Sequence, residues 1–137
     1  MPGIEALIQM EEDGSISFGN YTLNEKSKKQ DVEHQGDLYK VKTFYEITKL
    51  ERNGMFVYES VPGTAVEHFT ESDDGVVCRV EGFKASQVTV QLEEETLYQV
   101  YENGEMTAEI MTNVSGKLAV NLDLEDGVPV DLEIIKA

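Results

Sequence analysis

The side chains best suited to hold a metal ion are the two histidines, His34 and His68. Carboxylates that could join them lie at Glu33, Asp37 and Glu67, and imidazole and carboxylate are common metal ligands. Two histidines and one cysteine are too few for a tight transition-metal site, and the sequence has no Asp-rich loop of the calcium-binding type. We therefore predict no functional metal and no other cofactor.

The segment from Val61 to Phe69, which contains His68, resembles the turn-and-histidine segment of the cupin family. Cupin barrels hold a metal with several histidines and one glutamate, so the resemblance implies a ligand role for His68. The paired histidines of that family's first motif are missing, and no second histidine motif follows downstream. A structural or surface role for His68 is therefore the expectation.

Nucleophilic catalysis finds little support in the residues. The single cysteine, Cys78, lies in a valine-rich run typical of a strand, which predicts a buried core thiol. No serine stands in a G-x-S-x-G elbow, and the glycines are scattered at turns rather than gathered in a phosphate-binding loop. Glu59 and Glu67 could lie nearly opposite each other as a glycosidase-type acid pair, but an exposed acidic face explains them equally well. We name no catalytic residue.

Aromatic side chains offer a second kind of site. Phe56 and Tyr58 are expected to share a strand face, with Phe69 across from Phe56. A line of aromatic rings can stack on sugars, although core or interface packing is the more common use. Phe56, Tyr58 and His68 are the residues we would assign to ligand binding.

Strands and turns must position these residues, because turn dipeptides recur along almost the whole chain. The runs between them are rich in Val, Ile, Tyr, Phe and Thr. This pattern predicts an all-β fold, an antiparallel sandwich or barrel built from short hairpins, with less than roughly a tenth of the residues in helix.

The clearest stretch predicts a three-stranded meander over residues 45–52, 55–61 and 64–70. Asn53-Gly54 fits a type I′ turn, which would place Arg52 opposite Met55 and Leu50 opposite Val57. Pro62-Gly63 fits a type II turn, with glycine taking the positive φ.

The chain is expected to form one domain over residues 1–137, with possible sub-units at 1–75 and 76–137. The second of these alternates apolar and polar residues like a half-sandwich, similar to small immunoglobulin-like modules. Residues 4–10 could form a helix, a strand or an arm laid on the chain's own sheet or on a neighbouring subunit. Residues 24–36 have almost no apolar content and predict a mobile loop or edge segment.

The formal charge of −16, from 11 basic and 27 acidic residues, argues against nucleic acid and against an anionic membrane surface as partners. Residues 1–50 carry six lysines and nine acids, while residues 51–137 carry five basic residues and eighteen acids. This asymmetry could let one face meet another in an assembly. The first residues have neither a basic patch nor an apolar signal core, and the lone cysteine fits a reducing compartment, so we predict a cytoplasmic protein.

Three segments, residues 14–21, 39–64 and 112–118, resemble a family of short, uncharacterised clostridial all-β proteins, some of which carry the automatic label "endosialidase". The residues do not support that label. Sialidases bind the sialate carboxylate with an arginine cluster on a six-bladed propeller, whereas this chain has only Arg52 and Arg79 and is too short for such a propeller. The resemblance therefore implies no catalytic residue.

The sequence favours a non-enzymatic protein that acts through self-assembly or binding of another protein. A closed, symmetric homo-oligomer is expected, because closed point groups are common for identical chains, with the apolar side chains of residues 4–10 as its docking arm. The alternative is a carbohydrate-related protein, either a glycan-binding module or a small glycosidase-like hydrolase.

Overall fold

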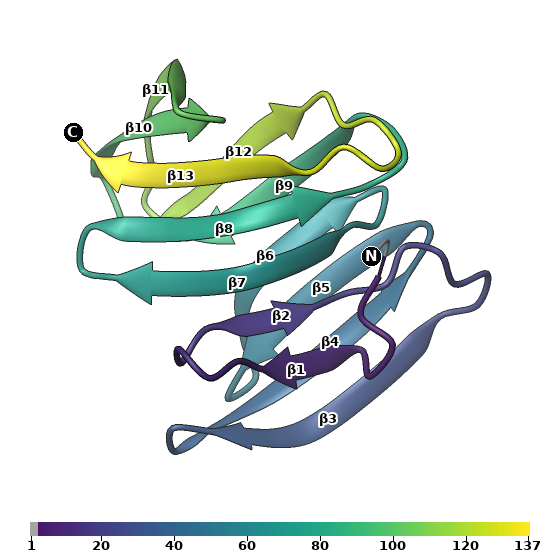
Figure 1. The fold of residues 1–137 in the computed structure, drawn as a ribbon. Helices are drawn as coiled ribbons and strands as arrows, with labels where there is room; N and C mark the ends of the chain where they lie inside the picture. The colour runs from purple at the N-terminus through teal and green to yellow at the C-terminus, as the bar shows by residue number, and fades with distance from the viewer. Residues whose placement is uncertain (1–2) are drawn as a thin grey trace.

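The computed structural model describes residues 3–137, and these residues form two antiparallel sheets and no helix. The sheets lie face to face as two layers of a sandwich, which confirms the predicted all-β class and selects the sandwich over the barrel (Figure 1). The strands are β1 (Ile8–Met10), β2 (Ile16–Phe18), β3 (Ser27–His34), β4 (Asp37–Phe44), β5 (Ile47–Arg52), β6 (Met55–Val61), β7 (Ala65–Ser72), β8 (Gly75–Glu81), β9 (Ser86–Gln91), β10 (Leu97–Glu102), β11 (Glu105–Met111), β12 (Lys117–Leu122) and β13 (Val130–Lys136).

The seven-stranded sheet has the order β1-β2-β7-β8-β13-β10-β11, and the six-stranded sheet has the order β12-β9-β6-β5-β4-β3. Strands from early and late parts of the chain therefore occur in both sheets. β13 lies between β8 and β10, in the interior of the seven-stranded sheet (Figure 1). One continuous apolar core fills the space between the layers.

The β5–β6 hairpin closes through Asn53 and Gly54, whose φ angles of 52° and 78° are those of a type I′ turn. This prediction is confirmed, as is the pairing of Arg52 with Met55. A bulge at Val57 shifts the rest of the register, so Leu50 lies opposite Tyr58 and not opposite Val57 as predicted.

The predicted meander is wrong beyond β6. Pro62 and Gly63 do not turn the chain back within one sheet but carry it from β6, in the six-stranded sheet, to β7, in the seven-stranded sheet. Gly63 does not have the positive φ that a type II turn requires. Close packing is its role instead, because a Cβ atom at this position would lie 2.1 Å from the carbonyl oxygen of Phe44.

The segment over residues 4–10 lies on the chain's own sheet. Its last three residues form β1, which pairs with β2, and the side chains of Ile4 and Ile8 are buried with 6% and 4% exposure. Of the alternatives left open by the sequence, the structure has a strand docked within the same chain. Most of the polar stretch 24–36 is also ordered as a strand, because β3 forms the edge of the six-stranded sheet beside β4.

Candidate functional site

The structure does not bring together the three residues assigned to ligand binding. Tyr58 is fully buried in the core, where burial raises the pKa of its phenol and its hydroxyl hydrogen-bonds Thr64 at 2.8 Å. Phe56 lies on the outer face of the six-stranded sheet, with Lys117 Nζ 4.6 Å from its ring centre. The expectation that Phe56 and Tyr58 share a face is wrong because the bulge at Val57 puts them on opposite sides of the sheet.

Phe69 belongs to an aromatic cluster between the sheets. Its ring centre lies 5.7 Å from that of Phe18 and 6.2 Å from that of Tyr58, both edge to face. Phe69 is therefore not across from Phe56 as predicted, because β7 belongs to the other sheet. The cluster supports the packing interpretation of the aromatic residues.

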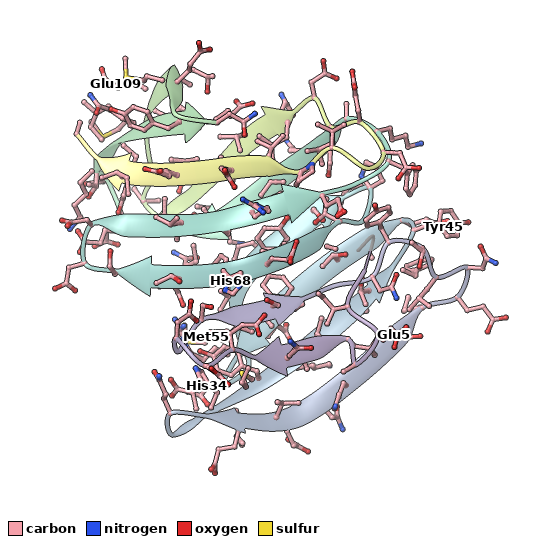
Figure 2. The ribbon with its side chains drawn as sticks, in the orientation of Figure 1. Glu5, His34, Tyr45, Met55, His68 and Glu109 are labelled. Carbon is pink, nitrogen blue, oxygen red and sulfur yellow. The ribbon has the colours of Figure 1, made fainter. Side chains whose placement is uncertain are left out.

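Both histidines contact the turn between β1 and β2, and Figure 2 shows them at the same end of the sandwich. His34 Nε2 lies 3.0 Å from the carbonyl oxygen of Gly14, and His68 Nδ1 lies 3.4 Å from a carboxylate oxygen of Asp13. Within residues 3–137, no three histidine, cysteine or acidic side chains come together in a way that could hold a metal ion.

Ser15, His68 and Asp13 form a cluster that the sequence analysis missed. The Ser15 hydroxyl donates to Asp13 at 2.5 Å and lies 3.0 Å from His68 Nδ1. A catalytic triad needs its serine and its aspartate on opposite ring nitrogens of the histidine, whereas here both approach Nδ1. The cluster therefore ties β7 to the β1–β2 turn rather than activating a nucleophile, and the Asp-Gly-Ser turn sequence was its only signal.

Two other candidates for catalysis are not arranged for it: Cys78 is inert, and Glu59 and Glu67 are separated. Cys78 is buried in the core as predicted, and burial raises the pKa of its thiol to about 12. Glu59 lies on the outer face of the six-stranded sheet and Glu67 on the outer face of the seven-stranded sheet, beside Arg79. The two carboxylates therefore do not face each other, and the possible acid pair is wrong.

Lysines gather on the outer face of the six-stranded sheet, where β3, β4 and β5 lie side by side. The register places Lys28 opposite Lys42 and Lys42 opposite Lys49, so three ammonium groups form a row across the strands. Lys40 lies two residues before Lys42 on β4, on the same face. We call these four residues the lysine face; together with Glu51 they line a shallow hollow of about 160 Å³.

Acidic side chains compensate only part of the lysine face. The register places Glu51 opposite Lys40 and Glu59 opposite Lys49, while Lys42 lies between Lys28 and Lys49. Partial burial, followed by the charges of Lys26, Lys49, Lys28 and Lys40, lowers the pKa of Lys42. Glu51 supplies the ion pair to this cluster, with 3.7 Å between its carboxylate and Lys49 Nζ. Like charges directly opposite each other destabilise a sheet, so this arrangement opposes folding. Residues that oppose folding in this way are typical of functional surfaces.

A polar cleft opens between the two sheets near His34, with a volume of about 230 Å³. Its walls include Tyr39 and Arg52 from one sheet and Thr70 and Glu71 from the other. Arg52 donates a hydrogen bond to Glu71, and this bond raises the pKa of the guanidinium. The ion pair spans the cleft and joins the sheets, so the charge of Arg52 is already matched within the chain.

A shallow groove at the opposite end exposes aromatic rings. It has a volume of about 340 Å³ and is lined by Tyr45, Glu46, Val61, Pro62, Phe83 and Lys84. Tyr45 is 43% exposed and Phe83 is 37% exposed. Two exposed rings beside one carboxylate and one ammonium group resemble a surface for stacking and hydrogen bonding more than a reaction centre.

No family model, no curated protein and no solved structure matches this chain. The clostridial resemblance therefore stays a prediction. The described residues include no helix of the length and apolarity that a membrane span requires.

Proposed function

We propose that this β-sandwich is a non-enzymatic binding module, and that its lysine face docks an acidic protein partner. The observation that carries the proposal is the row of Lys28, Lys42 and Lys49 across three neighbouring strands. Five of the eleven basic residues, these three with Lys26 and Lys40, lie in or beside this one area of a chain whose net charge is −16. A partner bearing carboxylates relieves the repulsion between the lysines and is held by the same charges.

The flatness of the surface supports a macromolecular partner. The lysines project from consecutive strands about 4.8 Å apart, and the hollow between them is shallow. Half-exposed apolar side chains, Phe44 and Ile47, lie on the same outer face and add apolar contact area. The buried thiol of Cys78 supports a reducing compartment such as the cytoplasm.

The test is binding of fluorescently labelled poly-L-glutamate, followed by anisotropy over a range of salt concentrations. We expect the unmodified protein to bind, with affinity falling as salt rises, and Lys42→Glu to weaken binding by at least about tenfold. Lys84→Glu, an exposed change of equal charge outside the lysine face, is the matched control and keeps the affinity.

A stability measurement on the same variants makes the test independent of folding defects. The carboxylate introduced by Lys42→Glu would lie between Lys28 and Lys49, so this variant is expected to fold at least as stably as the parent. Loss of binding without loss of stability supports the proposal. Equal binding of polyglutamate by Lys42→Glu and the parent contradicts it. If heparin binds and polyglutamate does not, the partner of the lysine face is a sulfated glycan and not an acidic protein.

A second candidate function, glycan binding, is favoured by the groove that Tyr45 and Phe83 line. Sugar rings stack their C–H faces on exposed aromatic rings, and Glu46 and Lys84 could bond hydroxyl groups beside them. Of the described residues that line the groove, Glu46 alone is a carboxylate, which supports binding rather than glycosidase-type hydrolysis. Tyr45→Ala should abolish any oligosaccharide binding seen on a glycan array, while Leu38→Ala, an exposed apolar change at the other end of β4, should not.

A further inference from the structure

The outer face of the seven-stranded sheet has the opposite charge to the lysine face. Glu67, Asp131, Glu133 and Glu109 project from β7, β13 and β11, and their neighbours in sequence alternate toward the core. Arg79 is the basic side chain among them, and its Nε lies 2.9 Å from Asp131. We call Glu67, Glu109, Asp131 and Glu133 the acidic face.

The two charged faces lie on opposite sides of the sandwich. The lysine face belongs to the six-stranded layer and the acidic face to the seven-stranded layer, with the core between them (Figure 1). Each sheet presents strands of similar length, six to eight residues in the central part, so the two outer faces have similar dimensions. A single chain therefore carries both members of a complementary pair, pointing in opposite directions.

We propose that the acidic partner of the lysine face is the acidic face of a second copy of this chain. The inference rests on the proposed function, because it names the partner of the same surface. Since the two surfaces differ, the contact is heterologous: after pairing, one copy keeps a free lysine face and the other keeps a free acidic face. Repetition of the contact gives an open stack of sandwiches, front to back, rather than a closed two-fold dimer.

The area of the face limits the size of the contact. Six strands about 4.8 Å apart and seven residues at about 3.3 Å each give a face of roughly 24 by 23 Å. Two such faces together bury roughly 1,100 Å², near the lower limit for a specific interface. The net charge of −16 on each copy opposes approach, but at 0.15 M salt this repulsion is screened beyond about 8 Å. The stack is therefore weak, and its population depends on protein concentration.

Sedimentation velocity over a concentration series, from micromolar to millimolar protein at 0.15 M salt, tests the proposal. We expect the average mass to rise with concentration and to return to the monomer value of 15.3 kDa at 1 M salt. A mass of 15.3 kDa at every concentration contradicts the inference. If poly-L-glutamate still binds in that case, the lysine face keeps its proposed function and only the identity of the partner is wrong.

Paired charge reversals identify the surfaces. Lys42→Glu with Lys49→Glu makes both faces acidic, and Glu109→Lys with Glu133→Lys makes both faces basic. Each double variant alone is expected to stay monomeric, and an equimolar mixture of the two is expected to associate. Glu12→Lys with Glu94→Lys is the control for the second double variant. It makes the same charge change as Glu109→Lys with Glu133→Lys, but in two exposed loops, and should associate like the parent. Association by either face variant alone, or none in the mixture, overturns the front-to-back arrangement.

Discussion

Hydroxyl groups form a buried chain beneath the crossing from β6 to β7. Thr48 Oγ1 donates to the carbonyl oxygen of Thr64 at 2.7 Å and accepts from the Thr64 amide at 3.1 Å. Thr43 joins it at 2.8 Å, while Ser60 and Tyr58 bond the Thr64 hydroxyl, each at 2.8 Å. These side chains are fully buried, so the network satisfies backbone groups that no water reaches.

Thr48→Val is expected to lower the free energy of unfolding by about 2 kcal/mol, because the amide and the carbonyl of Thr64 both lose their partner. Thr89→Val, the same change on the half-exposed outer face of β9, is expected to have little effect. Urea denaturation of the two variants measures the difference. Equal stability of both would mean that the Thr48 hydroxyl is dispensable.

Glu81 is a buried carboxyl group with 6% exposure, and burial raises its pKa above the ordinary value. A raised pKa means that folding favours the protonated form, so the ionised form at pH 7 destabilises the fold. Glu81→Gln is therefore expected to raise the melting temperature at pH 7. The gain should shrink as the pH falls through the raised pKa of Glu81 and vanish below about pH 4, where the parent carboxyl is protonated in both states.

Thermal melts of Glu81→Gln and the parent between pH 7 and pH 4 check this expectation. Glu133→Gln, on the exposed outer face of β13, is the control and should give no comparable gain. A gain that stays constant across the pH range would show that ionisation of Glu81 is not its cause.

The sequence could not reveal these buried polar groups. A threonine in an alternating strand fits either face, and the pattern of β5 does not tell an inward hydroxyl from an outward one. The burial of Cys78 was predictable because its valine-rich neighbours suit a core strand, whichever strand it pairs with. The contact of Ser15 and Asp13 with His68 was not predictable, because His68 lies 53 residues after Ser15.

At the scale of elements, local turn chemistry decided some connections and left others open. Asn53-Gly54 selects a two-residue hairpin because both residues tolerate positive φ, and the structure has that turn. Pro62-Gly63 is an equally strong turn signal, but a turn within a sheet and a crossing between sheets have the same local sequence. The choice between them depends on which strand lies beside β7, and that is β2, from far earlier in the chain.

Gly54→Val is expected to destabilise the fold by about 1 kcal/mol or more, because a β-branched residue resists the φ of 78° at this position. No atom lies within 4 Å of a Cβ added there, so the cost comes from the backbone alone. Met55→Val, on the adjacent exposed position of β6, is the control and should change stability little. Thermal unfolding of both variants provides the comparison, and equal melting points would contradict the turn assignment.

Ile8→Ala is expected to cost about 2–4 kcal/mol, because the Ile8 side chain is buried in the core although β1 has only three residues. Gln9→Ala, its exposed neighbour, should be almost neutral. Chemical denaturation at two protein concentrations measures both changes. A loss of stability that depends on concentration would indicate that the segment docks on a neighbouring copy instead of its own sheet.

For the whole molecule, the sequence predicted an all-β sandwich or barrel but not how charge divides between the two layers. Counting by halves of the chain shows an excess of acid after residue 50. The structure distributes charge by face instead, because strands of both halves contribute to each sheet and register decides which side chains meet. Lys26 to Lys29 and Lys40 to Lys42 were visible as basic clusters, but their alignment with Lys49 follows only from the pairing of β3, β4 and β5.

Added salt is expected to raise the melting temperature by a few degrees, because a net charge of −16 makes the compact state repel itself. Raising sodium chloride from 0.01 M to 0.15 M shortens the screening length from about 30 Å to about 8 Å. Scanning calorimetry measures the change. The same series near pH 4.3, the isoelectric point of the sequence, is the control and should show no such gain.

The interior position of β13 restricts how the protein can fold during synthesis. Residues 130–136 separate β8 from the β10–β11 hairpin, so that hairpin has no place in the seven-stranded sheet until β13 has been made. After β8, β10 and β11 have left the ribosome and before β13 follows them, the nascent chain exposes the unpaired edge of β8 and the apolar sides of β10 and β11. A chaperone that covers exposed strand edges would have its longest opportunity to act in this interval, before β13 completes the sheet.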